Sequence, residues 1–485
     1  MEPASDRRAL EVEDQRQYDV IVIGAGSTGE NVADRATKRG LSAVVVEADL
    51  VGGDCSYWAC MPSKALLRPG QVLAAARRVP GARQAVTGDL DAAAALQRRD
   101  RFTSGWDDAG QVAWLRDAGI DLVRGQGRLA GERRVDVETD DGTVVLRARR
   151  AVCVATGSAP ALPPVAGLAD ARPWTTKEAT SSAAPPQRLV VLGGGVAGCE
   201  LAQAWASLGT KVTVLEMAGR LLPAHEPFVG ELLAASMRDA AVDVRTGVRA
   251  SAVERRSDGS VAVHLDGGDT VAGDELLVAA GRRPRTDDVG LDTVGLPPGR
   301  WIEVDDTMAA TGVPGSWLYA AGDVNNRVLL THQGKYQARV CGDAIVARAA
   351  GVLEETPWSP HVATADHGAV PQVIFTDPEV AAVGVSEAQA QAAGLRVRAV
   401  DYEIGHVAGA ALHADDYRGH ARLVVDEDRR VVVGATFVGP DAGELLHAAT
   451  IAVVGEVPLD RLWHAVPAYP TLSEIWLRLL ETYGL

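Results

Sequence analysis

Two closely spaced cysteines carry the strongest chemical signal in this chain. Cys55 and Cys60 lie in the run GGDCSYWACMPSK, which spans residues 52–64. Two thiols this close in sequence can close to a disulfide and open again, so the pair can store two electrons. In an ideal helix, residues five apart lie more than ~7 Å from each other, near or beyond the limit for bridging. The segment must therefore bend between the cysteines, and Pro62 predicts that the regular helix begins late.

The neighbours of the cysteines favour a reactive pair over a packing pair. A thiolate close to a helix N-terminus and to Lys64 is stabilised, which favours thiol exchange. A buried pair of packing cysteines is the alternative, and the flanking Gly-Gly and Pro-Ser-Lys disfavour it. The remaining cysteines fall at apolar or helical positions and are predicted to pack in the core; they are Cys153, Cys199 and Cys341.

A nucleotide-binding pattern precedes the cysteines. An apolar strand over residues 18–24 runs into a G-x-G-x-x-G turn, a helix follows to Lys38, and a second strand over residues 43–46 ends on Glu47. Glycines in such a turn let the backbone approach a pyrophosphate at the helix N-terminus, and the acid accepts ribose hydroxyls. The turn glycines are Gly24, Gly26 and Gly29.

The same pattern recurs further along the chain. A strand over residues 189–192 enters a second glycine turn, a helix is predicted over residues 200–208, and a strand over residues 211–215 ends on Glu216. The turn glycines are Gly193, Gly195 and Gly198. Two dinucleotide sites are predicted. The alternative is that the chain has two such domains but that only one of them binds a dinucleotide. Glu216 can accept from an adenosine 2′-hydroxyl and repels a 2′-phosphate, which favours NADH over NADPH, although Arg220 lies close enough to soften this preference.

The other segments complete an α/β architecture. Strands that enter glycine turns recur at residues 152–158, 276–282 and 318–323, and a helix is predicted over residues 332–349. A linker over residues 352–360 precedes a region in which strand-like and helical runs alternate, as in a separate α+β domain. Its predicted strands cover residues 370–375, 421–425 and 431–437, and its predicted helices cover residues 387–393, 444–454 and 473–483.

Composition narrows the class of protein. The chain has 485 residues, a formal charge of −16 and 47% hydrophobic residues, which disfavours nucleic acid or an anionic membrane as the main partner. Five cysteines are too few for a disulfide-stapled secreted scaffold. Residues 1–17 are charged and predict a short mobile tail, neither a signal peptide nor an anchor. No apolar run reaches the ~18 residues of a membrane span. A cytoplasmic setting is therefore predicted.

The order of these motifs resembles the FAD-dependent pyridine nucleotide–disulfide oxidoreductases, a family that includes dihydrolipoamide dehydrogenase, glutathione reductase and mercuric reductase. The resemblance extends from about residue 18 to the end of the chain. It rests on the motifs at residues 24–29, 55–64, 155–158, 193–198, 281–284, 320–323, 370–379 and 470–474. It implies two Rossmann-like dinucleotide-binding domains, for FAD and NAD(P)H, plus a C-terminal α+β dimerisation domain. The implied ranges are 18–165 with 290–355 for FAD, 166–289 for NAD(P)H and 361–485 for the dimer interface.

The resemblance also assigns roles to individual residues. Cys60 is similar to the thiol nearest the flavin, and Cys55 to the interchange thiol that meets the substrate. Lys64 is similar to the lysine near the reactive flavin nitrogen, paired with Glu200. The residues assigned to FAD are Gly24, Gly26, Gly29, Glu47, Thr156, Gly157 and Asp323. The residues assigned to the nicotinamide nucleotide are Gly193, Gly195, Gly198, Glu216 and Gly281, and no metal is implied. The family forms homodimers in which each active site borrows residues from the partner subunit.

The chain departs from the family at the C-terminal motif. The family reads His-Pro-Thr-x-x-Glu there, whereas this chain has Tyr469 in place of the histidine and keeps Glu474. A phenol has a reference pKa near ~10 against ~6.5 for histidine, so it donates a hydrogen bond but is a poor base at neutral pH. His464 could substitute, although an ordinary exposed histidine is favoured. An aromatic residue before Pro470 also suits a cis peptide bond.

The loop between the two cysteines departs as well. The family has a small or polar stretch where this chain has Tyr57 and Trp58. The two rings either pack beneath the flavin domain or narrow the substrate entrance. Asp54 occupies a position where threonine is common, and a carboxylate there opposes ionisation of Cys55. These changes put turnover of lipoamide or glutathione in doubt, and mercury reduction is disfavoured because no cysteine follows Cys341.

The leading hypothesis is a flavoenzyme that passes electrons from NADH through FAD to Cys55–Cys60 and on to an unidentified disulfide or other small acceptor. Tyr469 and Glu474 of the partner subunit are expected to shape that pocket. The alternatives are dihydrolipoamide dehydrogenase itself, a quinone or metal-ion reductase or non-disulfide chemistry at the same site, and a binding component of a multienzyme complex.

Overall fold

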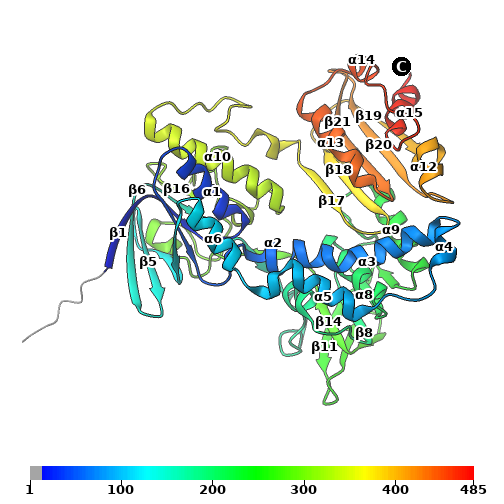
Figure 1. Cartoon of the computed structure of the whole chain (residues 1–485), viewed down its shortest axis with the longest axis horizontal. Coiled ribbons are helices and arrows are strands. Elements are labelled where there is room, and N and C mark those ends of the chain that lie inside the picture. Colours follow the sequence, from blue (N-terminus) through cyan, green and yellow to red (C-terminus); the bar gives the residue numbers. More distant parts are fainter. Residues whose placement is uncertain (1–13) are drawn as a thin grey trace, which may run out of the picture. The chain divides into compact units, whose positions relative to one another are not determined.

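The computed structural model describes residues 14–485, which divide into two compact units (Figure 1). The first unit comprises the described part of Met1–Gly53 together with Asp107–Ser158 and Pro284–Ala363. The second unit comprises Asp54–Trp106, Ala159–Arg283 and Thr364–Leu485. Each unit is thus assembled from three separate stretches of chain. Within residues 14–485, no helix combines the length and the apolar character needed to cross a membrane.

A seven-stranded sheet forms the centre of the first unit. Its order is β3-β2-β1-β6-β5-β4, and β16 also pairs with β6. β1, β2, β3, β6 and β16 pair in parallel, whereas β5 pairs antiparallel with β4 and with β6. The strands are β1 Asp14–Ile23, β2 Ala43–Glu47, β3 Asp121–Arg124, β4 Gln126–Leu129, β5 Arg134–Thr139, β6 Gly142–Val154 and β16 Leu318–Ala320.

Both faces of the parallel strands are covered, which explains their continuous apolar sequence. Val20 and Val22 point into a core shared with α1 (Ser27–Lys38) and α10 (Thr331–Ala350). Ile21 and Ile23 point into a second core on the opposite face. The two helices pack closely side by side (Figure 1) because α10 has glycines where α1 approaches; a Cβ at Gly342 would lie 2.6 Å from the Cβ of Arg35.

The second unit contains a four-stranded parallel sheet of order β10-β9-β8-β14. Helices α8 and α9 follow its strands, and α8 contributes Cys199, Leu201, Ala202 and Trp205 to the largely aliphatic core. A three-stranded antiparallel sheet, β11-β12-β13, is inserted after β10. The bounds are β8 Arg188–Leu192, β9 Lys211–Glu216, β10 Asp243–Thr246, β14 Glu275–Val278, β11 Ala250–Arg255, β12 Val261–Leu265, β13 Thr270–Gly273, α7 Thr176–Ser181, α8 Val196–Ser207 and α9 Pro227–Asp239.

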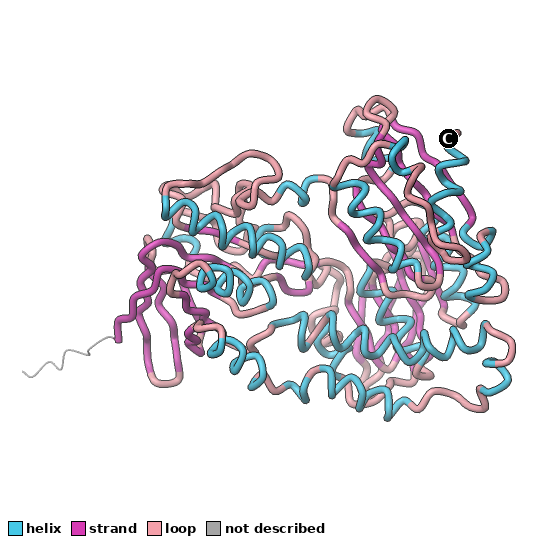
Figure 2. Tube along the Cα trace, turned by 45° about the horizontal axis from the view of Figure 1, so that its top comes forward, coloured by secondary structure: helices cyan, strands magenta, loops and turns pink. Residues whose placement is uncertain are grey.

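The last 120 or so residues form a five-stranded antiparallel sheet of order β17-β18-β21-β20-β19 with helices along it. Near the C label in Figure 2, helices run alongside these strands, as the contacts of α13 with β18 and of α15 with β19 require. The bounds are β17 Pro371–Ile374, β18 Glu379–Gly384, β19 Val397–Glu403, β20 His420–Asp426, β21 Val431–Gly439, α11 Glu387–Ala392, α12 Ala408–His413, α13 Leu446–Val454, α14 Leu459–Leu462 and α15 Glu474–Tyr483.

Several further elements complete the chain. The two cysteines lie on α2 and α3, two helices that follow one another with a break between them. The helices are α2 Gly53–Tyr57, α3 Cys60–Arg78, α4 Ala82–Ala85, α5 Ala92–Phe102 and α6 Ala109–Asp117; the short strands are β7 Ser158–Pro160 and β15 Arg282–Pro284. The 3₁₀ turns are η1 Ser104–Trp106, η2 Leu291–Val294, η3 Asp323–Asn325, η4 Thr364–His367, η5 Ile404–His406 and η6 Ala442–Leu445.

The predicted α/β fold class is confirmed, with local differences in the elements. The helix predicted over residues 200–208 begins at Val196, because Gly195 already caps it. The first strand begins at Asp14, so the predicted mobile tail is wrong for residues 14–17, and residues 1–13 of that tail lie outside the described residues. The division into FAD, NAD(P)H and dimer-interface domains stays a prediction. The chain passes from one unit to the other at residues 158–159, 283–284 and 363–364, close to the predicted domain limits.

Candidate functional site

The first glycine turn is shaped by close backbone contacts. Gly24 has φ +101°, and a Cβ on it would lie 2.5 Å from the carbonyl oxygen of Ala155. A Cβ on Gly29 would lie 1.9 Å from the carbonyl oxygen of Gly24. Gly26 caps α1 without a side-chain hydrogen bond to the first N–H groups of the helix. Because larger residues would collide at these positions, the turn keeps the helix N-terminus open for an anion such as a pyrophosphate.

Glu47 holds this turn through both of its carboxylate oxygens. Oε2 accepts from the N–H of Ala25 at 2.7 Å, and Oε1 accepts from the N–H of Asp49 at 2.9 Å. Burial raises the pKa of Glu47, while the two backbone N–H groups act in the opposite direction. Each carboxylate oxygen keeps a further lone pair, so Glu47 can still accept a ribose hydroxyl.

The other residues predicted to bind FAD also lie in the first unit. The hydroxyl of Ser158 donates to Asp323 Oδ2 at 2.5 Å, and Thr156 Oγ1 donates to the carbonyl oxygen of Arg285 at 2.8 Å. Gly157 has φ +71°, which the turn after β6 requires. The first unit therefore collects every residue predicted for FAD, and the cramped glycine turn with its open helix end fits an adenine dinucleotide.

Glu30 is a residue of the first unit that the sequence analysis missed. It lies in the first turn of α1 and is 8% exposed, and its Oε1 is buried without a hydrogen-bond partner among the described residues. Burial raises the pKa of Glu30 to about 7; Lys335 lowers it and Glu47 raises it further. No sequence signal marks this residue, because a glutamate in the first turn of a helix is ordinarily a solvated partner of the helix dipole.

The second glycine turn repeats the geometry of the first. A Cβ on Gly193 would lie 2.5 Å from the carbonyl oxygen of Ala279, and a Cβ on Gly198 would lie 1.9 Å from that of Gly193. Gly195 caps α8. Glu216 accepts from the N–H of Gly194 at 2.5 Å and from that of Ala218 at 2.6 Å. The second unit therefore holds its own dinucleotide turn, and Gly281 lies in the same unit.

Arg220 does not extend toward a nucleotide 2′-phosphate. Its guanidinium donates to the carbonyl oxygens of Pro223 at 2.9 Å and His225 at 3.3 Å. An arginine engaged with its own loop gives up those bonds if it moves to a phosphate, whereas Glu216 is already placed at the end of β9. This arrangement favours NADH.

Replacing Glu216 tests the nucleotide preference. We expect Glu216→Gln to lower the ratio of kcat/KM for NADH to that for NADPH by about tenfold, since a charged hydrogen-bond acceptor contributes about 1.5–3 kcal/mol. Steady-state kinetics with both nucleotides measure the ratio. Arg220→Gln is the control and should leave the ratio unchanged; a wild-type preference for NADPH would contradict the assignment.

The cysteines lie on either side of a helix break. Cys55 lies in α2, and Cys60 is the first residue of α3. Ala59 separates the two helices with φ −138° and ψ −95°, outside helical values. The predicted bend is therefore confirmed, although the regular helix begins at Cys60 and already includes Pro62. Both cysteines are partly exposed, and Cys60 lies at a helix N-terminus, where a thiolate is stabilised.

Lys64 and Glu200 form the predicted ion pair in the second unit. Lys64 Nζ lies 2.7 Å from Glu200 Oε2, with the two side chains 33% and 4% exposed. The second oxygen of Glu200 accepts from the N–H of Phe375 at 2.9 Å, and the ring centre of Phe375 lies 5.1 Å from Lys64 Nζ. Glu200 thus joins the helix that carries Cys60 to the residue that directly follows β17. The role of Lys64 at the flavin stays a prediction.

Asp54 has a cationic partner that the sequence did not reveal. Arg282 lies 3.3 Å from Asp54 Oδ2, and both side chains are about three-quarters buried. The guanidinium offsets the charge that was expected to oppose ionisation of Cys55. Arg282 directly follows Gly281, so the pair joins the start of α2 to the strand β15.

The C-terminal motif is divided between surface and interior. Tyr469 is 78% exposed, and its bond to Pro470 is cis as predicted. His464, five residues earlier in the sequence, is also exposed. Glu474 is buried, and its Oε2 accepts from the N–H of Gly409 at 3.0 Å. Within one chain Glu474 therefore fixes the start of α15 to α12, and any role with Tyr469 in a partner's active site stays a prediction.

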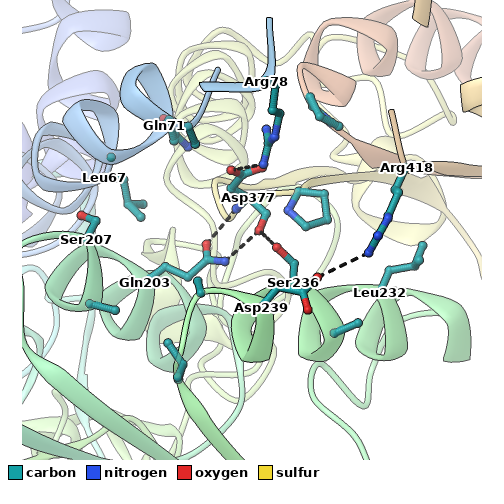
Figure 3. A pocket seen from close by; sticks show the side chains of 18 of the residues that line it. Leu67, Gln71, Arg78, Gln203, Ser207, Leu232, Ser236, Asp239, Asp377 and Arg418 are labelled. Carbon is teal, nitrogen blue, oxygen red and sulfur yellow. Dashed lines mark hydrogen bonds and ion pairs between the residues drawn. The ribbon is translucent and has the colours of Figure 1, made fainter. Parts of the chain in front are cut away.

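A separate cavity of about 560 Å³ lies between α3, α8 and α9 in the second unit (Figure 3). Arg78 pairs with Asp377 at 2.6 Å, and Gln203 donates to the carbonyl oxygen of Asp377 and accepts from its N–H. Asp239 and Arg418 pair at 3.4 Å at the rim. The hydroxyl of Ser236 in α9 also donates to the carbonyl oxygen of Asp377 at 2.7 Å. Three helices are thus joined to residue 377, and the contacts around the cavity hold these elements together.

Known proteins match this arrangement over nearly the whole chain. The family model for pyridine nucleotide-disulphide oxidoreductases matches residues 18–339, and the model for their dimerisation domain matches residues 370–479. Dihydrolipoyl dehydrogenase 3 of Pseudomonas aeruginosa is 33% identical over 467 residues, covering 94% of this chain and 96% of that protein. A mercuric reductase of Staphylococcus aureus is 30% identical over 460 residues, covering 94% and 81%. The solved structure of LpdA from Mycobacterium tuberculosis superposes with a TM-score of 0.82 at 27% identity, covering 96% and 100%.

Proposed function

Because the chain belongs to the pyridine nucleotide-disulphide oxidoreductase family, we propose that it passes electrons from NADH through FAD to a redox-active Cys55–Cys60 pair and then to a small acceptor. Members of this family are NAD(P)H-dependent flavoenzymes, so this chain uses FAD and NAD(P)H as cofactors. The dithiol step, the preference for NADH and the acceptor are the proposed part. In balance, NADH, one proton and the disulfide give NAD⁺ and two thiols.

The observation that carries the dithiol step is the helix break between the cysteines. The break places Cys60 at the start of α3 and leaves Cys55 within the separate short helix α2, which relieves the spacing that an unbroken helix would impose. Bound FAD would accept a hydride from the nicotinamide and release two electrons. Cys60 is assigned to take up those electrons and Cys55 to meet the acceptor. Lys64 forms an ion pair with Glu200 and lies one helical turn after Cys60, so its ammonium group is carried by the same helix as that thiol.

The acceptor is proposed to be a small disulfide or a related oxidant. The 33% identity to a dihydrolipoyl dehydrogenase supports dihydrolipoamide as a second candidate substrate. Tyr469 argues against rapid turnover of that substrate, because a phenol is a poor base at neutral pH. Quinones, metal ions and carbon-centred substrates are the remaining classes of acceptor. The enzyme is proposed to work in the cytoplasm.

A homodimer is proposed for the working form. The dimerisation family model matches residues 370–479. Large apolar side chains of this region are exposed in the single chain, as expected for a surface that a second copy covers. They include Leu412 at 71%, Ile451 at 57%, Val466 at 85% and Tyr469 at 78% exposure. An assembly role in a multienzyme complex without electron transfer is the competing function.

Anaerobic titration of the FAD-loaded protein with NADH tests the dithiol step. The wild type should take up about four electrons per chain, two for FAD and two for the disulfide, and gain two titratable thiols. A long-wavelength absorbance band should accompany the first two electrons. Cys60→Ser should take up only about two electrons and show no such band.

A matched cysteine replacement controls for thiol counting. Cys153→Ala removes a fully buried cysteine in β6 and should behave as the wild type does. Uptake of only about two electrons by the wild type, without new thiols, would rule out the dithiol step. Absence of any NADH oxidation would favour the assembly role. Reduction of NAD⁺ by dihydrolipoamide at rates typical of enzymes would assign the second candidate substrate.

A further inference from the structure

Four side chains of the second unit form a column against the loop between the cysteines. Lys177 of α7 lies over the ring of Trp58, with Nζ 4.2 Å from the ring centre. Trp58 stacks on Trp106 with ring centres 6.0 Å apart and planes inclined by 22°. The guanidinium of Arg99 in α5 lies 5.2 Å from the ring centre of Trp106. Each of the two stacked indoles therefore has a cation against it, and one of the indoles belongs to the loop itself.

The far end of this column is firmly anchored. Arg99 is 2% exposed and donates to the carbonyl oxygens of Thr180 at 2.7 Å and Ser182 at 3.0 Å. Its Nε also pairs with Asp100 at 2.6 Å. A buried guanidinium with three acceptors cannot shift without leaving donors unpaired, which costs free energy. Trp106 therefore rests on a fixed support.

The same tryptophan also bonds to the backbone of the loop. Trp106 Nε1 donates to the carbonyl oxygen of Tyr57 at 3.2 Å. Tyr57 is the last residue of α2, and the indole N–H reaches a carbonyl at the end of this helix. Tyr57 itself is buried. One side chain thus caps the end of α2 and stacks on the residue that follows it.

We propose that Trp106 is a positioning residue for the dithiol: by capping α2 and stacking on Trp58 it holds the helix break in the geometry that lets Cys55 and Cys60 close. The inference rests on the proposed function, since it concerns the same pair. Trp58 packs on Trp106 within its own unit, and the two alternatives for the bulky loop, packing beneath the flavin domain or narrowing the substrate entrance, stay predictions.

The physical consequence is a shift in the redox equilibrium of the pair. In exchange with glutathione, two glutathione thiols are oxidised to glutathione disulfide while the Cys55–Cys60 disulfide is reduced to two thiols. Holding the break limits the conformations of the segment between the two cysteines, and under the proposal this favours the closed form. Loosening it lowers their effective concentration, so the equilibrium moves toward the dithiol.

The test uses Trp106→Phe in the FAD-loaded protein. Phenylalanine keeps an aromatic ring between Trp58 and Arg99 and removes the indole N–H. We expect the equilibrium constant for disulfide formation against glutathione to fall about tenfold, which corresponds to a rise of about 30 mV in the potential of this two-electron couple. Thiol counts after quenching in defined glutathione buffers measure the constant, and the flavin spectrum and thermal midpoint should remain close to those of the wild type.

Trp476→Phe is the matched control, because its indole N–H is buried without a partner among the described residues. It should leave the equilibrium constant unchanged. Lys177→Met is the second variant, which also tests the stack if Trp106→Phe does not fold; it removes the cation over Trp58 and should lower the constant about threefold. If the wild type forms a disulfide and every one of these variants that folds matches the control, the positioning role is overturned. If the wild type forms no disulfide, the proposed function fails as well.

Discussion

Gly29→Ala is expected to yield a protein without FAD, whereas Gly198→Ala is expected to yield a yellow protein that NADH no longer reduces. The two glycines hold the same place in the two turns, and an added Cβ would lie 1.9 Å from a carbonyl oxygen in both cases, that of Gly24 or of Gly193. Real Cβ atoms do not approach an oxygen that closely, so the helix must move away from its turn. Each variant should weaken binding of one dinucleotide by at least about 100-fold.

The pair of variants separates the two cofactor sites without changing any charge. FAD content from the absorbance of the purified protein, and NADH binding from the quenching of protein fluorescence, give the two affinities. Gly40→Ala is a suitable control, because a Cβ there meets no atom within 4 Å even though its φ of +87° adds some strain. Loss of FAD in Gly198→Ala with retention in Gly29→Ala would reverse the assignment of the two turns.

Glu30→Gln is expected to stabilise the protein at pH 8 and to have much less effect at pH 5. Burial raises the pKa of Glu30 to about 7 from an ordinary value of 4.5. The folded form therefore binds a proton that the unfolded chain releases, and the free energy of unfolding falls as pH rises from about 4.5 to 7. Above pH 7 the full penalty of roughly 3 kcal/mol is present, because 1.36 kcal/mol corresponds to each pKa unit. An amide never ionises, so the variant escapes this penalty.

Thermal midpoints of the FAD-loaded wild type and variant between pH 5 and pH 8 measure this difference. The variant should gain several degrees over the wild type at pH 8, about two degrees for each kcal/mol. Glu231→Gln removes an exposed carboxylate of α9 and should give a difference that does not depend on pH. A constant difference between Glu30→Gln and the wild type across this range would mean that Glu30 ionises as an exposed acid does.

The elements that bind dinucleotides could be predicted because their constraints are local. The strand, the glycine turn and the helix around Gly24 and Gly193 lie within a few tens of residues, and the acids at Glu47 and Glu216 end the next strand. The bend between Cys55 and Cys60 follows from the dimensions of a helix alone. Pattern and geometry at this range need no knowledge of the rest of the fold.

The contacts that were missed all join distant parts of the chain. Trp106 reaches the carbonyl of Tyr57, and Arg282 reaches Asp54, across long stretches of sequence that no periodic pattern links. Glu30 was missed for the opposite reason: its position is ordinary, and its burial depends on tertiary packing. The sequence left open whether Tyr57 and Trp58 pack beneath the flavin domain or narrow the substrate entrance, and the stack of Trp58 on Trp106 could not be predicted because it joins distant residues.

Glu47 and Glu216 have a kinetic consequence. Each carboxylate already accepts two backbone N–H groups of the loop that it closes, so neither dinucleotide loop has to be ordered by its cofactor. A binding surface that is shaped in advance does not spend binding free energy on ordering the chain. Cofactor capture is then a single bimolecular encounter, and its observed rate grows in proportion to cofactor concentration without levelling off at a rearrangement step.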